Sequence, residues 1–249
     1  MSFPNTISGM YGWEKQQTSE QKHKLGTEMV FVDGRKFRYV ENGGSAITEG
    51  LLVVSEAPAG NHDEDLAVAT TAAGSTTVAV TLGGTEAAKN LYAEGYLFIN
   101  IPILATSANP HEMYKVKSHA YVASGGVLTA TLDEPDGLVT AITNGTETVG
   151  LIKSPYKDIV VAPAAVAGRF VGVTTRSMTA NYFGWIQVAG LATVAMDGTP
   201  AFGTLVGASS NHAGQFLAIG ADTTPAIARV HGKAGVDNEY HTVFLMNLY

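Results

Sequence analysis

The chain has 249 residues and a formal net charge of −7, and 45% of its residues are apolar while only 15% are charged. This length and apolar content are sufficient for one large core or two smaller ones. The acidic balance argues against non-specific nucleic-acid binding, and the absence of cysteine excludes disulfides, thiolate zinc sites and a cysteine nucleophile.

The first 26 residues are polar and lack apolar periodicity, so we expect an extended N-terminal arm, with a short helix between Thr18 and Gly26 as the alternative. Residues 1–40 carry six Lys or Arg against four Asp or Glu, whereas the remainder carries nine against eighteen. Lys15, Lys22 and Lys24 are therefore candidate contacts to an acidic protein surface, and a solvated polar segment is the simpler alternative. No secretion signal and no apolar run of membrane-spanning length is found, so we expect synthesis in the cytoplasm and no membrane association.

A β-hairpin is predicted next, with strands over residues 28–32 and 35–40. Asp33-Gly34 lies between them, and this dipeptide favours a type I′ turn. Further strands are predicted over residues 51–54, 76–82, 96–99, 113–122, 127–132 and 147–152. Residues 86–94 are predicted to form a short helix, and residues 100–112, which contain two prolines, a long loop.

Residues 153–161 contain Pro155 and are our candidate domain boundary. Beyond it, short apolar runs recur every 8–12 residues between Gly, Pro and Asp-Gly turns, a rhythm typical of a β-barrel or sandwich. The predicted strands there cover residues 171–173, 182–188, 192–196, 205–206, 216–219, 226–230 and 242–248. The fold class is thus all-β, with an arm over 1–26, a β-rich region over 27–152 that holds an inserted middle subdomain (about 57–150), and a barrel or sandwich over 153–249.

Signals of catalysis or metal binding are weak. Asp63, Glu64 and Asp65 lack the spacing of a calcium-binding loop. His111 and Glu112 begin no HExxH motif. His231 and His241 have Asp237 and Glu239 between them, so a metal site there is the alternative to two ordinary, partly exposed histidines. Nucleophile-elbow, P-loop and dinucleotide-binding motifs are absent. We therefore predict no catalytic residue, no metal and no cofactor.

Tyr182-Phe183-Gly184-Trp185 is the most distinctive local motif. Strand alternation places Tyr182 and Gly184 on one face and Phe183 and Trp185 on the other. Tyr182 and Trp185 are candidates for a glycan-binding platform, and the alternative is a core strand in which Gly184 permits close backbone approach.

Several segments together resemble head decoration (cement) proteins of tailed phages. They are residues 34–40 followed by 46–53, residues 168–173 leading into 180–190, and then 192–194, Asp197-Gly198, 203–206 and the last strand, 242–248. The matching positions are strand and turn positions over about two thirds of the chain, so no site residue is carried across. The middle segment, about 57–150, lies outside the resemblance.

The resemblance implies a non-enzymatic virion protein that binds the major capsid protein on the outer capsid surface and stabilises the head, often as a homotrimer. Two alternatives stay open: a receptor- or glycan-binding tail or virion protein, favoured by Tyr182 and Trp185 exposed in a groove, and a carbohydrate-active enzyme, favoured by two carboxylates across a cleft.

Overall fold

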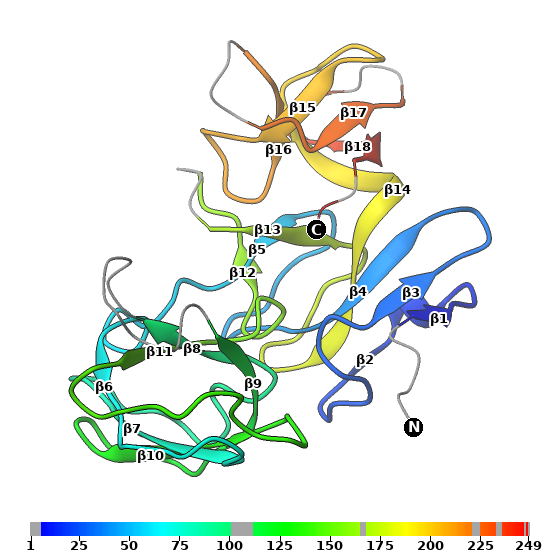
Figure 1. Cartoon of the computed structure of the whole chain (residues 1–249). Coiled ribbons are helices and arrows are strands. Elements are labelled where there is room, and N and C mark those ends of the chain that lie inside the picture. Colours follow the sequence, from blue (N-terminus) through cyan, green and yellow to red (C-terminus); the bar gives the residue numbers. More distant parts are fainter. Residues whose placement is uncertain are drawn as a thin grey trace. The chain divides into compact units, whose positions relative to one another are not determined.

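The computed structural model describes residues 6–100, 112–164, 168–220, 225–232, 236–246 and 248, and it divides the chain into two compact units. Unit 1 comprises residues 1–56 and 155–249, and unit 2 comprises residues 57–154. The described residues contain eighteen strands and one short 3₁₀ turn, so the all-β prediction is confirmed (Figure 1). The division differs from the predicted one, because residues 27–56 pair with strands that follow residue 155 rather than with the middle segment.

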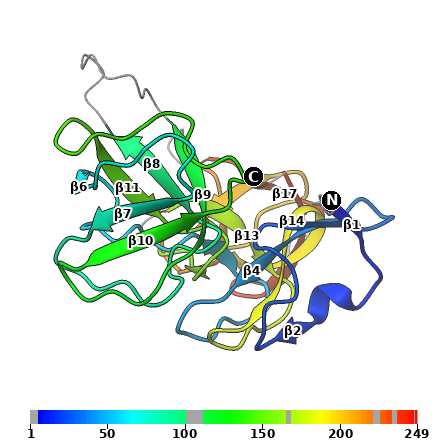
Figure 2. The same cartoon turned by 60° about the horizontal axis from the view of Figure 1, so that its bottom comes forward.

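Unit 1 is organised around one long strand, β14 (Phe183–Asp197). The other strands of this unit are β1 (Thr6–Ser8), β2 (Gln17–Thr18), β3 (Glu28–Val30), β4 (Lys36–Glu41), β5 (Leu52–Val54), β12 (Val160–Val161), β13 (Phe170–Thr174), β15 (Leu205–Ala208), β16 (Phe216–Ala218), β17 (Ala228–Val230) and β18 (Tyr240–Leu245). The first half of β14 pairs with β2, β4 and β13 (Figure 2). Its second half pairs with β18 and β16, so the same strand belongs to two substructures (Figure 1).

The second half of β14 belongs to a small closed barrel. Strand β14 pairs with β16, β16 with β15, β15 with β17, β17 with β18, and β18 with β14 again. Inward-facing apolar side chains fill its interior, among them Val194, Phe216 and Val243. This ring of strands is the barrel that the C-terminal rhythm predicts.

The first half of β14 lies in a sheet with apolar side chains packed on both faces. Trp185 joins Met29, Phe31, Phe37 and Tyr39 in one cluster. On the next position Ile186 joins a second cluster, with Val40, Val53, Ile159 and Val171 among its members. Because neighbouring residues of a strand face opposite sides, burial on both faces explains why Gln187 is the only polar residue between Phe183 and Ala189.

The β3–β4 hairpin is confirmed, but its turn type is different from the prediction. Phe31 and Arg35 close a three-residue loop, in which the Gly34 N–H donates to the Phe31 carbonyl. Positive φ occurs at Gly34 (85°) and not at Asp33. The loop is therefore a type I turn followed by a left-handed glycine, the usual geometry of three-residue hairpins.

The N-terminal segment is folded against unit 1 over its described residues. Strand β1 runs parallel to β3, and β2 pairs with β14. The only helical turn there is a 3₁₀ turn, Trp13–Lys15, and the alternative helix near Gly26 does not form. Residues 6–26 thus supply strands and contacts to this unit.

Unit 2 is a six-stranded antiparallel sheet in the order β6 (Leu66–Ala67), β11 (Thr148–Ile152), β8 (Tyr96–Asn100), β9 (Met113–Ser118), β10 (Val127–Leu132) and β7 (Thr77–Thr81). A bridge between Val68 and Val80 joins the two ends and closes it into a barrel. Its interior is filled by buried residues such as Tyr92, Leu97 and Leu128. The Tyr92 hydroxyl bonds His62 Nδ1, and burial together with the charge of Asp63 raises the pKa of Tyr92 to about 12.

The helix predicted over residues 86–94 is wrong. Three consecutive turns occupy residues 88–95 instead, closed by N–H donations from Leu91, Ala93 and Gly95 to carbonyls three residues earlier. Asn90 and Glu94 have positive φ, which stops a right-handed helix. The predicted loop over 100–112 lies almost wholly outside the described residues.

Candidate binding cleft and interaction surface

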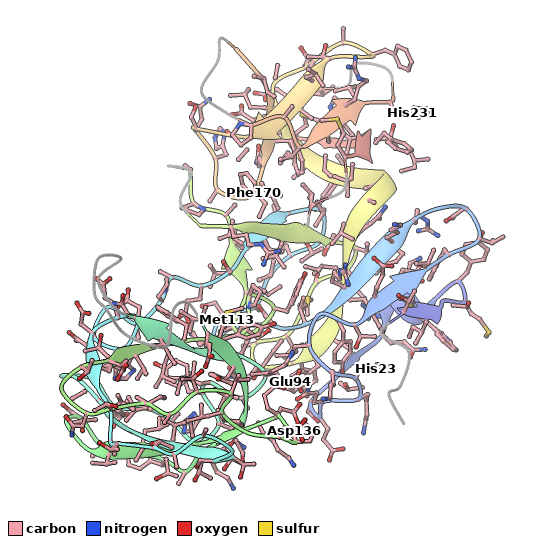
Figure 3. All side chains as sticks on the ribbon, viewed as in Figure 1. His23, Glu94, Met113, Asp136, Phe170 and His231 are labelled. Atoms are coloured by element: carbon pink, nitrogen blue, oxygen red, sulfur yellow. The ribbon has the colours of Figure 1, made fainter. Side chains whose placement is uncertain are left out.

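The aromatic motif at residues 182–185 is mostly core. Trp185 is 7% exposed, and its ring contacts Tyr39 at 5.0 Å and His23, which is labelled in Figure 3, at 5.4 Å between centroids. Phe183 stacks on Tyr39, on the same side as Trp185, and Tyr182 is half-buried. Because Trp185 is buried, it offers no platform to a glycan.

The three candidate lysines have different environments. Lys15 lines a cleft that is described below. Lys22 forms an exposed ion pair with Glu20, and the Lys24 carbonyl accepts hydrogen bonds from Thr27. Exposed ion pairs contribute little to stability, and Lys22 is instead tied to unit 1 by its backbone N–H, which donates to the Tyr39 hydroxyl at 3.0 Å.

No group of three or more His, Asp or Glu side chains within the described ranges is arranged to hold a metal ion. Asp65 accepts a hydrogen bond from the Asn100 side chain, and His241 is buried with its Nε2 beside the Val236 carbonyl. His231, labelled in Figure 3, contacts the ring of Phe202. His111 lies outside the described residues.

An Asp–Ser–His group at the barrel resembles a catalytic triad in composition but differs in geometry. Ser209 donates its hydroxyl proton to Asp197 at 2.6 Å and accepts from the backbone N–H groups of Asn211 and His212. The His212 ring faces Asp197 at 3.4 Å. A nucleophilic serine donates to the histidine, which the acid orients from its other side. Here the serine is bonded to the acid, so the group closes a turn.

This turn predicts acid-sensitive stability. The hydrogen bond from Ser209, with help from Asn211 and His212, lowers the pKa of Asp197. Because the pKa of Asp197 is lower in the folded state than its unfolded value of about 3.9, its carboxylate stabilises the protein at every pH above that unfolded value. This stabilisation is lost as the pH falls through the folded-state pKa. We expect the difference in unfolding free energy between wild type and Asp197→Asn to shrink below about pH 4, as measured by urea titrations at several pH values. A constant difference across this range would contradict the assignment.

A cleft of about 850 Å³ lies in unit 1, on the outer side of β14 and β18. Four groups of residues line it: Tyr11, Gly12, Glu14 and Lys15; Asp33, Arg35, Glu49 and Gly50; Thr174, Thr175 and Gln187; and Leu191, Ala192, Thr193, Tyr240 and Thr242. They come from the N-terminal segment, the β3–β4 turn, the loop before β5 and the strands β13, β14 and β18. This volume is within the range of ligand sites.

Hydrogen bonds hold the three acidic side chains of the cleft. Glu14 is buried and accepts from the Gly12 N–H. At Asp33, burial acts to raise the pKa, but hydrogen bonds from the Arg35 backbone N–H and guanidinium outweigh it and lower the pKa. The hydroxyl of Ser177 donates to Glu49 and lowers its pKa. Asp33 and Glu49 are thus stabilised as carboxylates, whereas a glycosidase needs one carboxyl with a raised pKa as its general acid.

An exposed apolar stripe adjoins the cleft. The outward positions of β18 and the residue that follows it are Tyr240, Thr242, Phe244 and Met246, and Leu191 of β14 lies directly opposite Phe244. Tyr240 and Phe244 are each 54% exposed, Leu191 45% and Met246 40%. Together these four side chains expose on the order of 400 Å², in the range of the largest, often functional, patch of a typical monomer. We call these four residues the β18 stripe.

Neither the cleft nor the β18 stripe was predicted from the sequence. The cleft draws on residues from 11 to 242, which only the fold brings together. The stripe does have a local signal, because residues 243–246 (Val-Phe-Leu-Met) are apolar on both alternating faces. A surface strand normally alternates apolar with polar residues, so this pattern indicates a second contact surface.

Comparison of the chain with protein-family models, with curated proteins and with solved structures finds no match. Within the described ranges, no helix is long and apolar enough to span a membrane.

Proposed function

We propose that the protein is a non-enzymatic decoration subunit that binds the outer surface of a tailed-phage head and cements it. The sequence resemblance suggests this role, and the observation that carries it is the β18 stripe. Aromatic and Met side chains are enriched in the buried centres of protein interfaces. The stripe would supply the apolar centre of one side of a standard interface, which buries about 800 Å² per partner.

The nature of the site also favours binding over turnover. The Asp197 group is closed by its own hydrogen bonds, and both displaced pKa values in the cleft are lowered. A cement protein needs no chemistry, because many weak contacts on one lattice reinforce each other through effective concentration. A protein that binds the assembled shell, but not its separate subunits, stabilises the assembled form by mass action.

Co-sedimentation with heads stripped of this protein tests the proposal. We expect saturable binding at a fixed ratio to the major capsid protein, and light scattering of the free protein tests the proposed homotrimer. Absence of binding to every form of the head would overturn the proposal.

Phe244→Glu should abolish or strongly weaken this binding. A charge at the centre of the stripe would be buried without a partner, and loss of a central aromatic contact typically costs about 2 kcal/mol or more, roughly 30-fold in affinity. Val127→Glu is the matched control, since Val127 is an apolar strand residue of unit 2 that is 60% exposed, against 54% for Phe244. Equal binding by wild type and Phe244→Glu would exclude the stripe as the head contact.

A further inference from the structure

The cleft beside β14 and β18 has features that head binding through Phe244 does not use. Phe244 and Met246 do not line it, whereas Tyr11, Lys15 and Arg35 do. The cleft therefore offers a second site on unit 1, which borders the β18 stripe and shares Tyr240 and Leu191 with it.

Two exposed tyrosines line the cleft, and they come from opposite ends of the chain. The Tyr11 ring is held by an edge contact with Phe31, at 5.4 Å between centroids, and by the Arg35 guanidinium at 5.7 Å. The Tyr240 hydroxyl lies 3.4 Å from the Glu49 carbonyl. A tyrosine has an apolar face and a polar tip, so both rings can contact a ligand that is apolar on one side and hydroxylated on the other.

Threonine hydroxyl groups also line the cleft. Thr193 and Thr242 are directly opposite each other on β14 and β18, and both are exposed. Thr175 adds a third hydroxyl, which donates to the Glu14 carbonyl. Hydroxyl pairs on neighbouring strands present donors and acceptors at fixed spacing, and a few such polar groups fix the orientation of a ligand.

The charges in the cleft nearly balance. Lys15 and Arg35 stand against Glu14, Asp33 and Glu49, and Arg35 Nε is paired with Asp33 at 2.8 Å. A site for nucleic acid or another polyanion would concentrate Lys and Arg without such acids. A strongly basic ligand would equally find no strong negative electrostatic potential in the cleft to attract it. The lining therefore fits a neutral ligand rich in hydroxyl groups.

We propose that this cleft binds a neutral oligosaccharide. The tyrosine rings pack against the C–H faces of the sugar rings, and the Thr193 and Thr242 hydroxyls, with the Arg35–Asp33 pair, bond the sugar hydroxyls. The cleft shares Tyr240 and Leu191 with the β18 stripe, whereas Tyr11, Thr193 and Arg35 belong to the cleft alone and Phe244 and Met246 to the stripe alone. Variants of the unshared residues therefore test the two proposals separately.

The test uses the full chain and a panel of neutral oligosaccharides (malto-, cello-, laminari- and chitohexaose), with heparin and dextran sulfate as charged comparators, in calorimetric titrations. We expect binding of at least one neutral sugar, weakened about tenfold or more by Tyr11→Ala, which removes an aromatic contact. Thr193→Val preserves the shape of the side chain and removes one hydroxyl, so it should also weaken binding even where Tyr11→Ala folds poorly.

Phe244→Glu is the matched control, because it lies outside the cleft and should bind the sugar as wild type does. Binding of no neutral sugar, binding of the polyanions alone, or sugar affinity unchanged in both Tyr11→Ala and Thr193→Val would overturn the assignment. The titration needs no phage heads, so its failure leaves the head-binding proposal standing, and failure of co-sedimentation leaves this one standing.

Discussion

Trp185→Ala should destabilise unit 1 by about 3–5 kcal/mol, the usual cost of truncating a buried tryptophan. The ring is almost wholly removed from solvent and packs among Met29, Phe37 and Tyr39. Alanine would leave a cavity in a cluster that joins β3, β4 and β14. Because the surrounding side chains belong to paired strands, they can collapse into this space only in part.

Urea unfolding followed by tryptophan fluorescence measures this loss. The chain has only two tryptophans, Trp13 and Trp185, and both belong to unit 1. Trp13 is partly exposed and remains as the reporter in the variant. Tyr182→Ala is the control, and we expect it to cost about 1 kcal/mol or less because Tyr182 is only half-buried. Equal costs for the two substitutions would contradict the assignment of Trp185 to the core.

The motif at residues 182–185 shows what a single sequence can predict. Alternation correctly placed Phe183 and Trp185 on one face. It did not decide whether that face is core or binding surface, since both use the same residue types. The deciding fact is that Met29, Phe37 and Tyr39 cover the ring, and those residues lie about 150 positions earlier in the chain. Such contacts between distant segments are not encoded in a local pattern.

The same limit applies to the site. Strand positions were predicted from apolar runs and turn residues, and most were confirmed. The cleft depends on Tyr11 and Tyr240 lying along one groove, which requires the pairing of β14 with β18 and the folding of the N-terminal segment onto unit 1. Sequence patterns predict where the strands are but not how distant strands pair. The surface that this pairing creates therefore cannot be predicted from them.

Gly190 illustrates how one residue misled the strand prediction. A glycine in an apolar run normally indicates a break, and two strands, 182–188 and 192–196, were predicted around it. The structure has one continuous strand, β14. Gly190 has a φ of 86°, and the ladder shifts register next to it, between Gln187 and Ala189. The glycine therefore lets one strand leave the β4 sheet and enter the barrel.

Gly190→Ala should consequently cost more than an ordinary glycine substitution. Any other residue at this φ loses about 1–2 kcal/mol to backbone strain. In addition, a Cβ at Gly190 would lie 3.1 Å from the Cα of Arg35, a backbone atom that moves only if the hairpin moves. We expect a total of about 3 kcal/mol, because strain and crowding add. Tryptophan-detected urea unfolding measures it in unit 1.

Gly203→Ala separates strain from crowding. Gly203 has nearly the same φ, 83°, in the same unit, and no atom lies within 4 Å of a Cβ placed there. It should therefore show the strain alone, about 1–2 kcal/mol. If Gly190→Ala loses clearly more unfolding free energy than Gly203→Ala, the difference is the cost of contact with Arg35. Arg35 also holds the Tyr11 ring in the cleft. We therefore expect Gly190→Ala to bind a cleft ligand more weakly than wild type, and Gly203→Ala to bind it as wild type does. Equal losses in the two variants would mean that the β3–β4 hairpin yields to the methyl group and that β14 does not fix the hairpin beside the cleft.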